Sequence, residues 1–273
     1  MSTITLTASM RSNLSSLKSI QKQMDVTQER LSTGKKVNSA IDNASSFYQA
    51  RSLTNRASDL DALLDGMGQG IQTIQAANEG IEAVTSFVEQ MKSVAESAAA
   101  LDAASATYDD DLAAYAKQFD AIKGEIDKLV ADASYQGVNL LKGGKLTVTF
   151  NETRSNKFDI QGEDVVAKMG IAKATGTWAS ATEVEASVGE ISKATDYLRS
   201  YATTLGNNYS IIETRQNFTE SLIDVLETGA DNLVLADMNE ESANYLALQT
   251  RQQLAINSLS LASQSAQSVL SLF

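Results

Sequence analysis

The chain has 273 residues, of which 22 are basic and 34 acidic, and it contains no histidine, cysteine or proline. Without histidine and cysteine, the usual zinc sites, cysteine nucleophiles, Ser-His-Asp triads and imidazole acid–base catalysis are excluded. An acidic chain with no basic cluster is also a poor electrostatic match for nucleic acid. We expect a protein that is not an enzyme and has no catalytic, cofactor or metal site, although buried carboxylates can act without histidine.

The N-terminal region has the heptad spacing of a coiled-coil seam, and the lack of proline permits long helices. Gly34 is expected to end this first helix in a left-handed cap, and residues 38–43 offer N-cap side chains for the next helix. The predicted seam consists of Met10, Leu14, Leu17, Ile20, Met24 and Leu31. The predicted inter-domain hinge consists of Gly34, Asn38, Ser39, Asp42 and Asn43.

A second helix is predicted over about residues 43–100, where apolar residues continue at heptad spacing from Leu53 to Ala98. At 1.5 Å per residue this helix would be roughly 85 Å long. Residues 100–110 are rich in Ala, Ser and Asp and are predicted to connect it to a shorter helix with apolar residues from Leu112 to Leu129.

Only residues 143–178 have a β-like pattern, and they predict one hairpin near 145–161. Apolar residues alternate with polar ones on both sides of a polar turn at 151–156. A lone hairpin is marginally stable, so it must pack against the helices.

Two further seams run from Val184 to Leu226 and from Tyr245 to the last residue, Phe273. The first and last seams hold many Ala, Ser and Gln residues, so neither helix gains much from a single partner. We expect both termini to be disordered in a single copy and to become ordered when many copies pack side by side. The residues of the last seam assigned to this packing are Leu248, Ala255, Leu259, Ala262, Val269 and Leu270.

These elements predict a mainly α fold, a long antiparallel helical coiled-coil rod with one small hairpin and paired N- and C-terminal helices. The predicted division is an N-terminal inner-core helix at 1–42, a rod domain at 43–235 and a C-terminal inner-core helix at 236–273. No stretch reaches the ~18 apolar residues of a membrane span, and the first residues lack the pattern of a cleavable signal.

Three segments resemble bacterial flagellins. LSTGKKVNSAIDNA at residues 31–44 is similar to the family signature LSSGxRINSAxDDA, and YQGVNLL at 135–141 is similar to FNGVxVL. QSVLSLF at 267–273 resembles the closing QNVLSLL of the family. The matches occur in the family's order and span nearly the whole chain, as expected of a short form with only the inner-core and rod domains.

The resemblance implies a structural subunit that polymerises into the flagellar filament for swimming motility. It also implies a secreted, extracellular protein whose partners are further copies of itself, the export apparatus, an export chaperone, and the hook-associated junction and cap proteins, with no membrane partner. The alternatives are the hook–filament junction protein of the same superfamily and a non-flagellar coiled-coil scaffold.

One stretch departs from flagellins that are recognised by a Toll-like innate immune receptor. Residues 89–95 read EQMKSVA where those flagellins have QRVRELA, so Gln90, Ser93 and Val94 replace Arg, Glu and Leu. The loss of a charged five-donor fork and of apolar volume predicts weak or no activation. Drift at solvent-facing helix positions would explain the substitutions equally well.

Two other motifs have simpler interpretations. GMGQG at 66–70 looks like a phosphate-binding loop, but no strand precedes it and a heptad passes through it, which favours close helix packing. The run Asp109 to Asp111 lacks the spacing of an EF-hand and is better explained as a solvated helix start.

Overall fold

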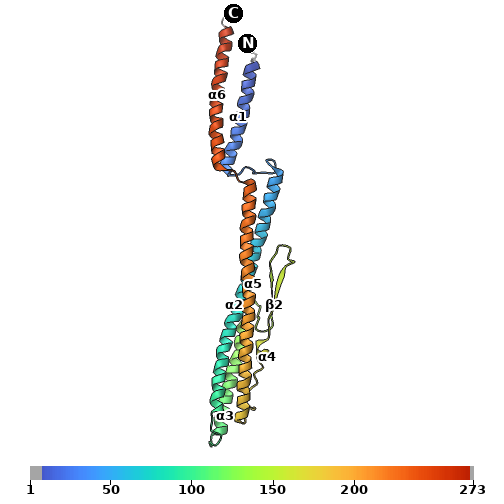
Figure 1. Ribbon diagram of the computed structural model, residues 1–273, viewed down its shortest axis with the longest axis vertical. Coiled ribbons are helices and arrows are strands. Elements are labelled where there is room, and N and C mark those ends of the chain that lie inside the picture. Colours follow the sequence, from blue (N-terminus) through green and yellow to red (C-terminus); the bar gives the residue numbers. More distant parts are fainter. Residues whose placement is uncertain (1–7, 271–273) are drawn as a thin grey trace. The chain divides into compact units, whose positions relative to one another are not determined.

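The computed structural model describes residues 8–270, apart from the side chains at 9, 266, 269 and 270. The mainly α fold with one hairpin is confirmed (Figure 1). In chain order the elements are α1 (Ala8–Thr33), α2 (Ala44–Ala99), α3 (Tyr108–Asp132), β1 (Lys145–Thr149), β2 (Lys157–Gln161), α4 (Val165–Met169), α5 (Ala181–Val234) and α6 (Met238–Leu270).

The chain divides into two compact units. The terminal unit contains residues 1–55 and 225–273, and the central unit contains residues 56–224. The borders between the units therefore lie within α2 and α5, whereas the domain borders expected from the sequence lie at the connections that precede α2 and follow α5. The predicted three-part division remains a prediction.

The central unit has one apolar core, built from α2, α3, α5, the hairpin, α4 and the loop that precedes α5. The heptad residues of α2 from Met67 to Ala98 are all buried, as the seam predicts. Phe119 of α3 is fully buried, and its ring lies 5.0 Å from that of Trp178. The largest fully buried side chains of the described chain all belong to this core: Met67, Ile74, Met91, Leu112, Phe119, Ile126, Leu140, Leu141, Ile191, Leu198, Leu205 and Ile212.

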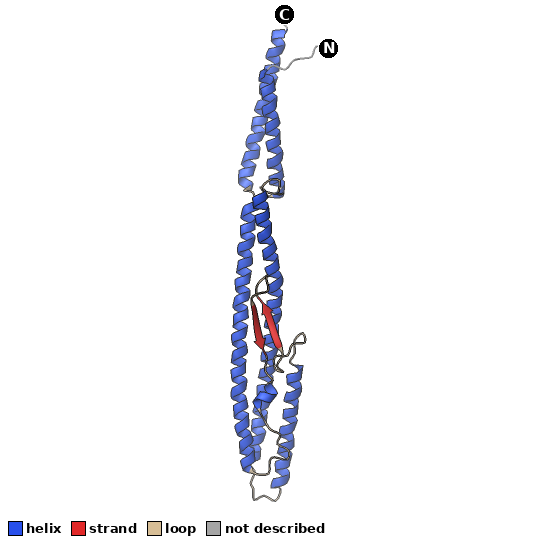
Figure 2. Cartoon of the chain, turned by 90° about the vertical axis from the view of Figure 1, so that its right-hand side faces the viewer, coloured by secondary structure: helices blue, strands red, loops and turns tan. Residues whose placement is uncertain are grey.

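The hairpin is where the sequence placed it, with Lys145 opposite Gln161 and Thr149 opposite Lys157 in an antiparallel register. Its two strands lie beside the long helices of the central unit (Figure 2). Val148 and Ile160 supply the buried face, and this packing supports a hairpin that would be marginal alone.

The glycines of the GMGQG segment differ in their surroundings. A Cβ at Gly70 would lie 2.7 Å from Cγ2 of Val148, so this glycine lets strand β1 approach α2 closely. Gly66 and Gly68 have nothing within 4 Å of the same position. The interpretation as close packing is confirmed at Gly70 and wrong at the other two, because among these three glycines only Gly70 lies under β1.

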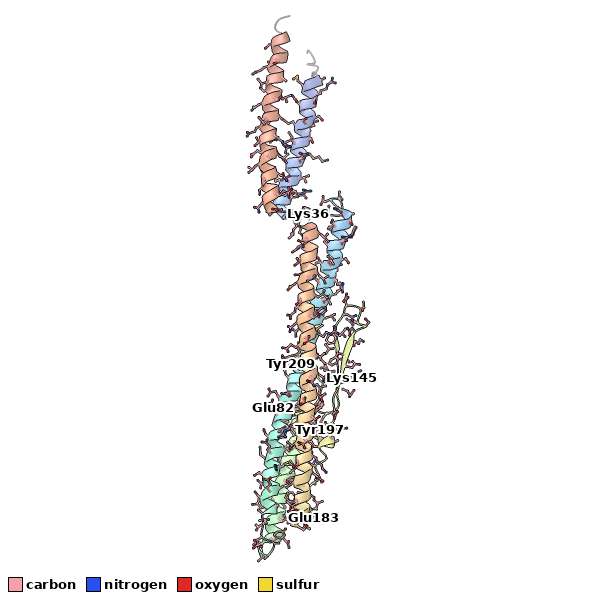
Figure 3. All side chains as sticks on the ribbon, in the orientation of Figure 1. Lys36, Glu82, Lys145, Glu183, Tyr197 and Tyr209 are labelled. Carbon is pink, nitrogen blue, oxygen red and sulfur yellow. The ribbon has the colours of Figure 1, made fainter. Side chains whose placement is uncertain are left out.

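Helix α4 was not predicted from the sequence. Asp164 caps it by accepting a hydrogen bond from the amide of Ala167, and Gly170 ends it with a φ of 63°. Two tyrosines of α5 hold the chain on both sides of the hairpin. The Tyr201 hydroxyl donates to the Leu140 carbonyl at 2.8 Å, and the hydroxyl of Tyr197, labelled on α5 in Figure 3, donates to Glu163 at 2.8 Å. Burial and the Glu163 hydrogen bond raise the pKa of Tyr197 well above its usual value, so it remains a donor.

In the terminal unit, α1 and α6 pair side by side (Figure 1). The expectation that both termini are disordered in a single copy therefore differs from the structure, in which the described parts of both are helical. The physical reason is that each helix covers the seam of the other, so one chain already supplies the partner that an isolated helix lacks.

Candidate assembly surface

The predicted hinge lies in the terminal unit, between α1 and α2. Gly34 has a φ of 72° and its amide donates to the Arg30 carbonyl, so it ends α1 in the left-handed cap that was predicted. The hinge is also tied to the α5–α6 connection by backbone bonds from Lys36 to Val234 (2.8 Å) and from Ala236 to Gly34 (3.0 Å). Because the two connections are bonded to each other, movement at one would strain the other.

Asp42 organises the rest of the hinge. Its carboxylate accepts hydrogen bonds from the amides of Asn38 (3.0 Å) and Ser39 (2.9 Å) and from the Ser39 hydroxyl. The amides of Ser39 and Asn38 lower the pKa of Asp42, so it stays ionised. Asn43 then caps α2 by accepting from the Ser46 amide at 3.1 Å. The predicted hinge residues thus form one bonded turn, and their role as a hinge remains a prediction.

Of the residues predicted to pack in the filament core, those with described side chains lie on the facing sides of α1 and α6. Met10, Met24 and Leu248 are buried within the single chain. The other members with described side chains are half-buried: Leu14, Leu17, Ile20, Leu31, Ala255, Leu259 and Ala262. The side chains of Val269 and Leu270 lie outside the described part of the chain. Contact of this seam with neighbouring copies stays a prediction.

Two polar contacts cross the same seam. Arg30 donates to Glu241 at 2.8 Å, and the Glu241 side chain is only 10% exposed. Gln252 donates to Gln21 at 2.7 Å. Because burying a carboxylate without a charged partner is costly, the Arg30–Glu241 pair favours the register of α1 against α6 in which it forms.

The opposite face of α6 carries leucines that the sequence reasoning missed. Leu246, Leu254 and Leu261 are 62%, 63% and 65% exposed. At 3.6 residues per turn they fall within an arc of about 80°, on the side away from the buried Leu248. These three leucines are named the α6 outer face. The sequence signal for this face is that its three leucines are not part of the seam and are spaced by eight and seven residues, which places them on one side of a helix.

The charge of α6 supports an assembly role for this face. Between residues 242 and 270 the only charged residue is Arg251, whereas the 25 residues of α3 include ten charged ones. A solvated helix usually has charged side chains on its exposed face. A helix segment that is exposed, almost free of charge and rich in leucine has the composition of a surface that becomes covered.

The substituted immune-receptor stretch lies in α2. Gln90 and Ser93 are exposed, but Val94 is only 9% exposed and belongs to the central core. The structure therefore leaves little of Val94 for a receptor to contact, and the expected apolar anchor at this position does not fit its burial. Reduced receptor activation remains a prediction, now resting on the two exposed positions.

Asp109, Asp110 and Asp111 lie in the exposed first turn of α3, where carboxylates interact favourably with the helix dipole. Within residues 8–270 the structure places no three acidic side chains close enough to hold a metal ion. No helix in the described part of the chain combines the length and apolarity that crossing a membrane requires.

Comparison with known proteins identifies the family. Residues 2–145 match the bacterial flagellin N-terminal helical region, and residues 188–273 match the bacterial flagellin C-terminal helical region. A flagellin of Brucella melitensis is 32% identical over 286 residues, covering 100% of this chain and 99% of that protein. Flagellin FljK of Caulobacter vibrioides is 29% identical over 262 residues, covering 95% of this chain and 94% of its own length.

A crystal structure of Bacillus cereus flagellin aligns with 55% of this chain and 86% of its own, at 14% identity and a TM-score of 0.48. The assignment rests on the sequence matches, which cover both terminal regions and, in the relatives, nearly the entire length. The chain belongs to the bacterial flagellin family.

Proposed function

We propose that this chain is a structural subunit of the bacterial flagellar filament and that it polymerises through its terminal unit. The observation that carries the assembly role is the α6 outer face, three exposed leucines in a stretch of α6, residues 242–270, that contains one charged residue. Flagellins are a structural protein family, which fits a chain without catalytic activity.

The physical argument concerns desolvation. Covering an exposed leucine releases roughly 1.5–3 kcal/mol, whereas burying an unpaired charge costs several kcal/mol. A helix face that carries leucines and no charge can therefore be covered by a neighbouring copy without the cost of burying an unpaired charge. The contact is repeated in every subunit, so a small gain in each one accumulates along a filament.

Several finer features belong to the same proposal. Residues 1–42 and 236–273 would form the inner core of the filament, and residues 43–235 the part outside it. The subunit would leave the cell through the flagellar export apparatus with the help of a chaperone, and would meet junction and cap proteins at the ends of the filament. The relatives named above are called flagellins, which favours a filament subunit over the junction protein.

The test is seeded polymerisation of purified chain followed by electron microscopy. Leu254→Gln combined with Leu261→Gln should slow or abolish filament growth, while circular dichroism of the single chain stays unchanged because both side chains are exposed. Leu254→Met is the matched control, since it keeps the apolar area, and it should polymerise normally. Normal growth of the double variant would contradict the role of the α6 outer face. Failure of the unmodified chain to form filaments on seeds would contradict the proposed function.

A further inference from the structure

The net charge of the chain is confined to one of its two units. The central unit has 14 basic and 26 acidic residues, which account for the entire charge of −12. The terminal unit has 8 of each sign and is neutral. Its charges are nevertheless segregated, because seven of the eight basic residues lie in residues 11–51 and five of the eight acidic ones in residues 227–241.

The structure places part of this segregated charge in two neighbouring grooves of the terminal unit. The first has a volume of about 480 Å³ and lies between α1 and α6. Its charged lining consists of Lys22, Arg30, Arg251 and Glu241. Arg30 and Glu241 are paired with each other. Lys22 and Arg251 are exposed and have no ion pair among the described residues, so this basic groove retains a charge of about +2.

The second groove has a volume of about 350 Å³ and lies where the hinge meets the start of α6. It shares the Arg30–Glu241 pair and adds Asp42, Asp237, Glu240 and Lys36. Asp42 is engaged by backbone amides of the hinge, and Asp237 accepts hydrogen bonds from the amides of Asn239 and Glu240. These bonds use the carboxylates as acceptors and leave their charge in place. This acidic groove therefore has a charge of about −2.

We propose that the acidic groove of one copy docks on the basic groove of the next copy. Opposite patches of equal charge steer two copies into one orientation and disfavour others, in which like charges would meet. The inference rests on the proposed polymerisation, because a filament of equivalent copies needs a contact between two different patches of the subunit. A neutral terminal unit also lets copies crowd together without the mutual repulsion that −12 charges would cause.

Charge reversal with matched net charge tests the docking. The first variant carries Lys22→Glu and Arg251→Glu, which turns the basic groove acidic. The control carries Lys117→Glu and Lys193→Glu, two exposed lysines of the central unit without ion pairs in the described structure. Both variants change the net charge equally, so a general effect of charge would appear in both. Seeded growth is measured at low salt and at 1 M salt, where the Debye length is about 3 Å.

The groove variant should grow at least about tenfold more slowly than the control at low salt, and the gap should narrow at 1 M salt. Glu240→Lys supplies a second readout. In the otherwise unmodified chain, Glu240→Lys should slow growth, because it weakens the attraction between the acidic groove and the basic groove. In the groove variant, the same change should restore part of the growth rate, because it weakens the repulsion between two acidic grooves. This reversal of sign cannot come from misfolding, and circular dichroism of each single chain checks the helices.

Equal growth of groove variant and control, or no restoration by Glu240→Lys, would overturn the docking while leaving the proposed function intact. A closed dimer from the unmodified chain with no filaments on seeds would overturn the docking and the proposed function together.

Discussion

The terminal and central units bury their apolar residues to different degrees. The largest fully buried side chains in the described chain all lie in the central unit, where three helices, a hairpin and a loop share one core. The α1–α6 seam of the terminal unit is mostly half-buried, and its outer leucines face solvent. The central unit therefore has an apolar core of its own. The terminal helices cover each other only partly and leave an apolar surface for further copies.

The largest effect is expected on polymerisation, from substitutions in the partly covered seam of the terminal unit. Leu259→Asp or Leu17→Asp should block polymerisation and leave the central unit folded. Each places a carboxylate in the half-buried seam of α1 and α6, at a cost of several kcal/mol per subunit once neighbours cover it. Electron microscopy after seeding measures polymerisation, and circular dichroism of the single chain measures whether the helices remain folded. Filaments formed normally by both variants would refute the assigned seam.

A substitution in the core of the central unit should instead lower its stability. Phe119→Ala removes a fully buried ring that packs on Trp178 and should lower the free energy of unfolding of the central unit by about 3–5 kcal/mol. Urea denaturation of the single chain, followed by tryptophan fluorescence, measures the change. Leu254→Met in the terminal unit is the control and should shift the midpoint little. A loss below about 1 kcal/mol would mean that the core is not packed as described.

Limited proteolysis should distinguish the units in the unmodified protein. In the single chain, cleavage is expected first within residues 1–42 and 236–273, because a thin seam opens at a lower free energy than a full core. A fragment close to the central unit should resist. In filaments the same segments should be protected by neighbouring copies. Equal resistance of the termini in single chains and filaments would contradict the difference in stability.

A pair of substitutions in one helix tests the close approach of strand β1. Gly70→Ala should destabilise the central unit by about 1–3 kcal/mol, because the added methyl group meets Val148. Gly68→Ala lies two residues away, has open space and should stabilise the helix by about 0.5–1 kcal/mol. Thermal unfolding of both variants measures the difference. Two changes of the same sign would show that β1 does not press on α2 at this point.

The smallest structural effect is expected at the immune-receptor stretch. Gln90→Arg with Ser93→Glu alters two exposed positions and should change stability by less than about 0.5 kcal/mol, while raising receptor activation in a reporter-cell assay. The variant keeps the third substituted position, Val94, unchanged, because Val94→Leu would enlarge a residue of the central core. Strong activation by the unmodified chain would overturn the prediction. No gain in the variant would place the deficit elsewhere.

The sequence alone determined most of the helices and their inner faces. Heptad spacing from Met67 to Ala98 and from Val184 to Leu226 identified which residues turn inward, because a repeat of threes and fours keeps one stripe of a helix facing its partner. The absence of proline allowed helices of 56 and 54 residues, and Gly34 marked the end of α1. The short helix α4 escaped detection, because five residues are too few to show a period.

Only the tertiary structure decided which apolar residues are already buried within the single chain. Periodicity assigns residues to a face but does not say how many faces have partners. The pairing of α1 with α6 covers Met24 and Leu248 and leaves Leu246, Leu254 and Leu261 uncovered. The two charged grooves likewise unite residues from opposite ends of the chain, such as Lys22 and Arg251, which no local pattern connects. The half-buried Arg30–Glu241 pair is likewise a contact between residues that lie side by side only after the chain has folded.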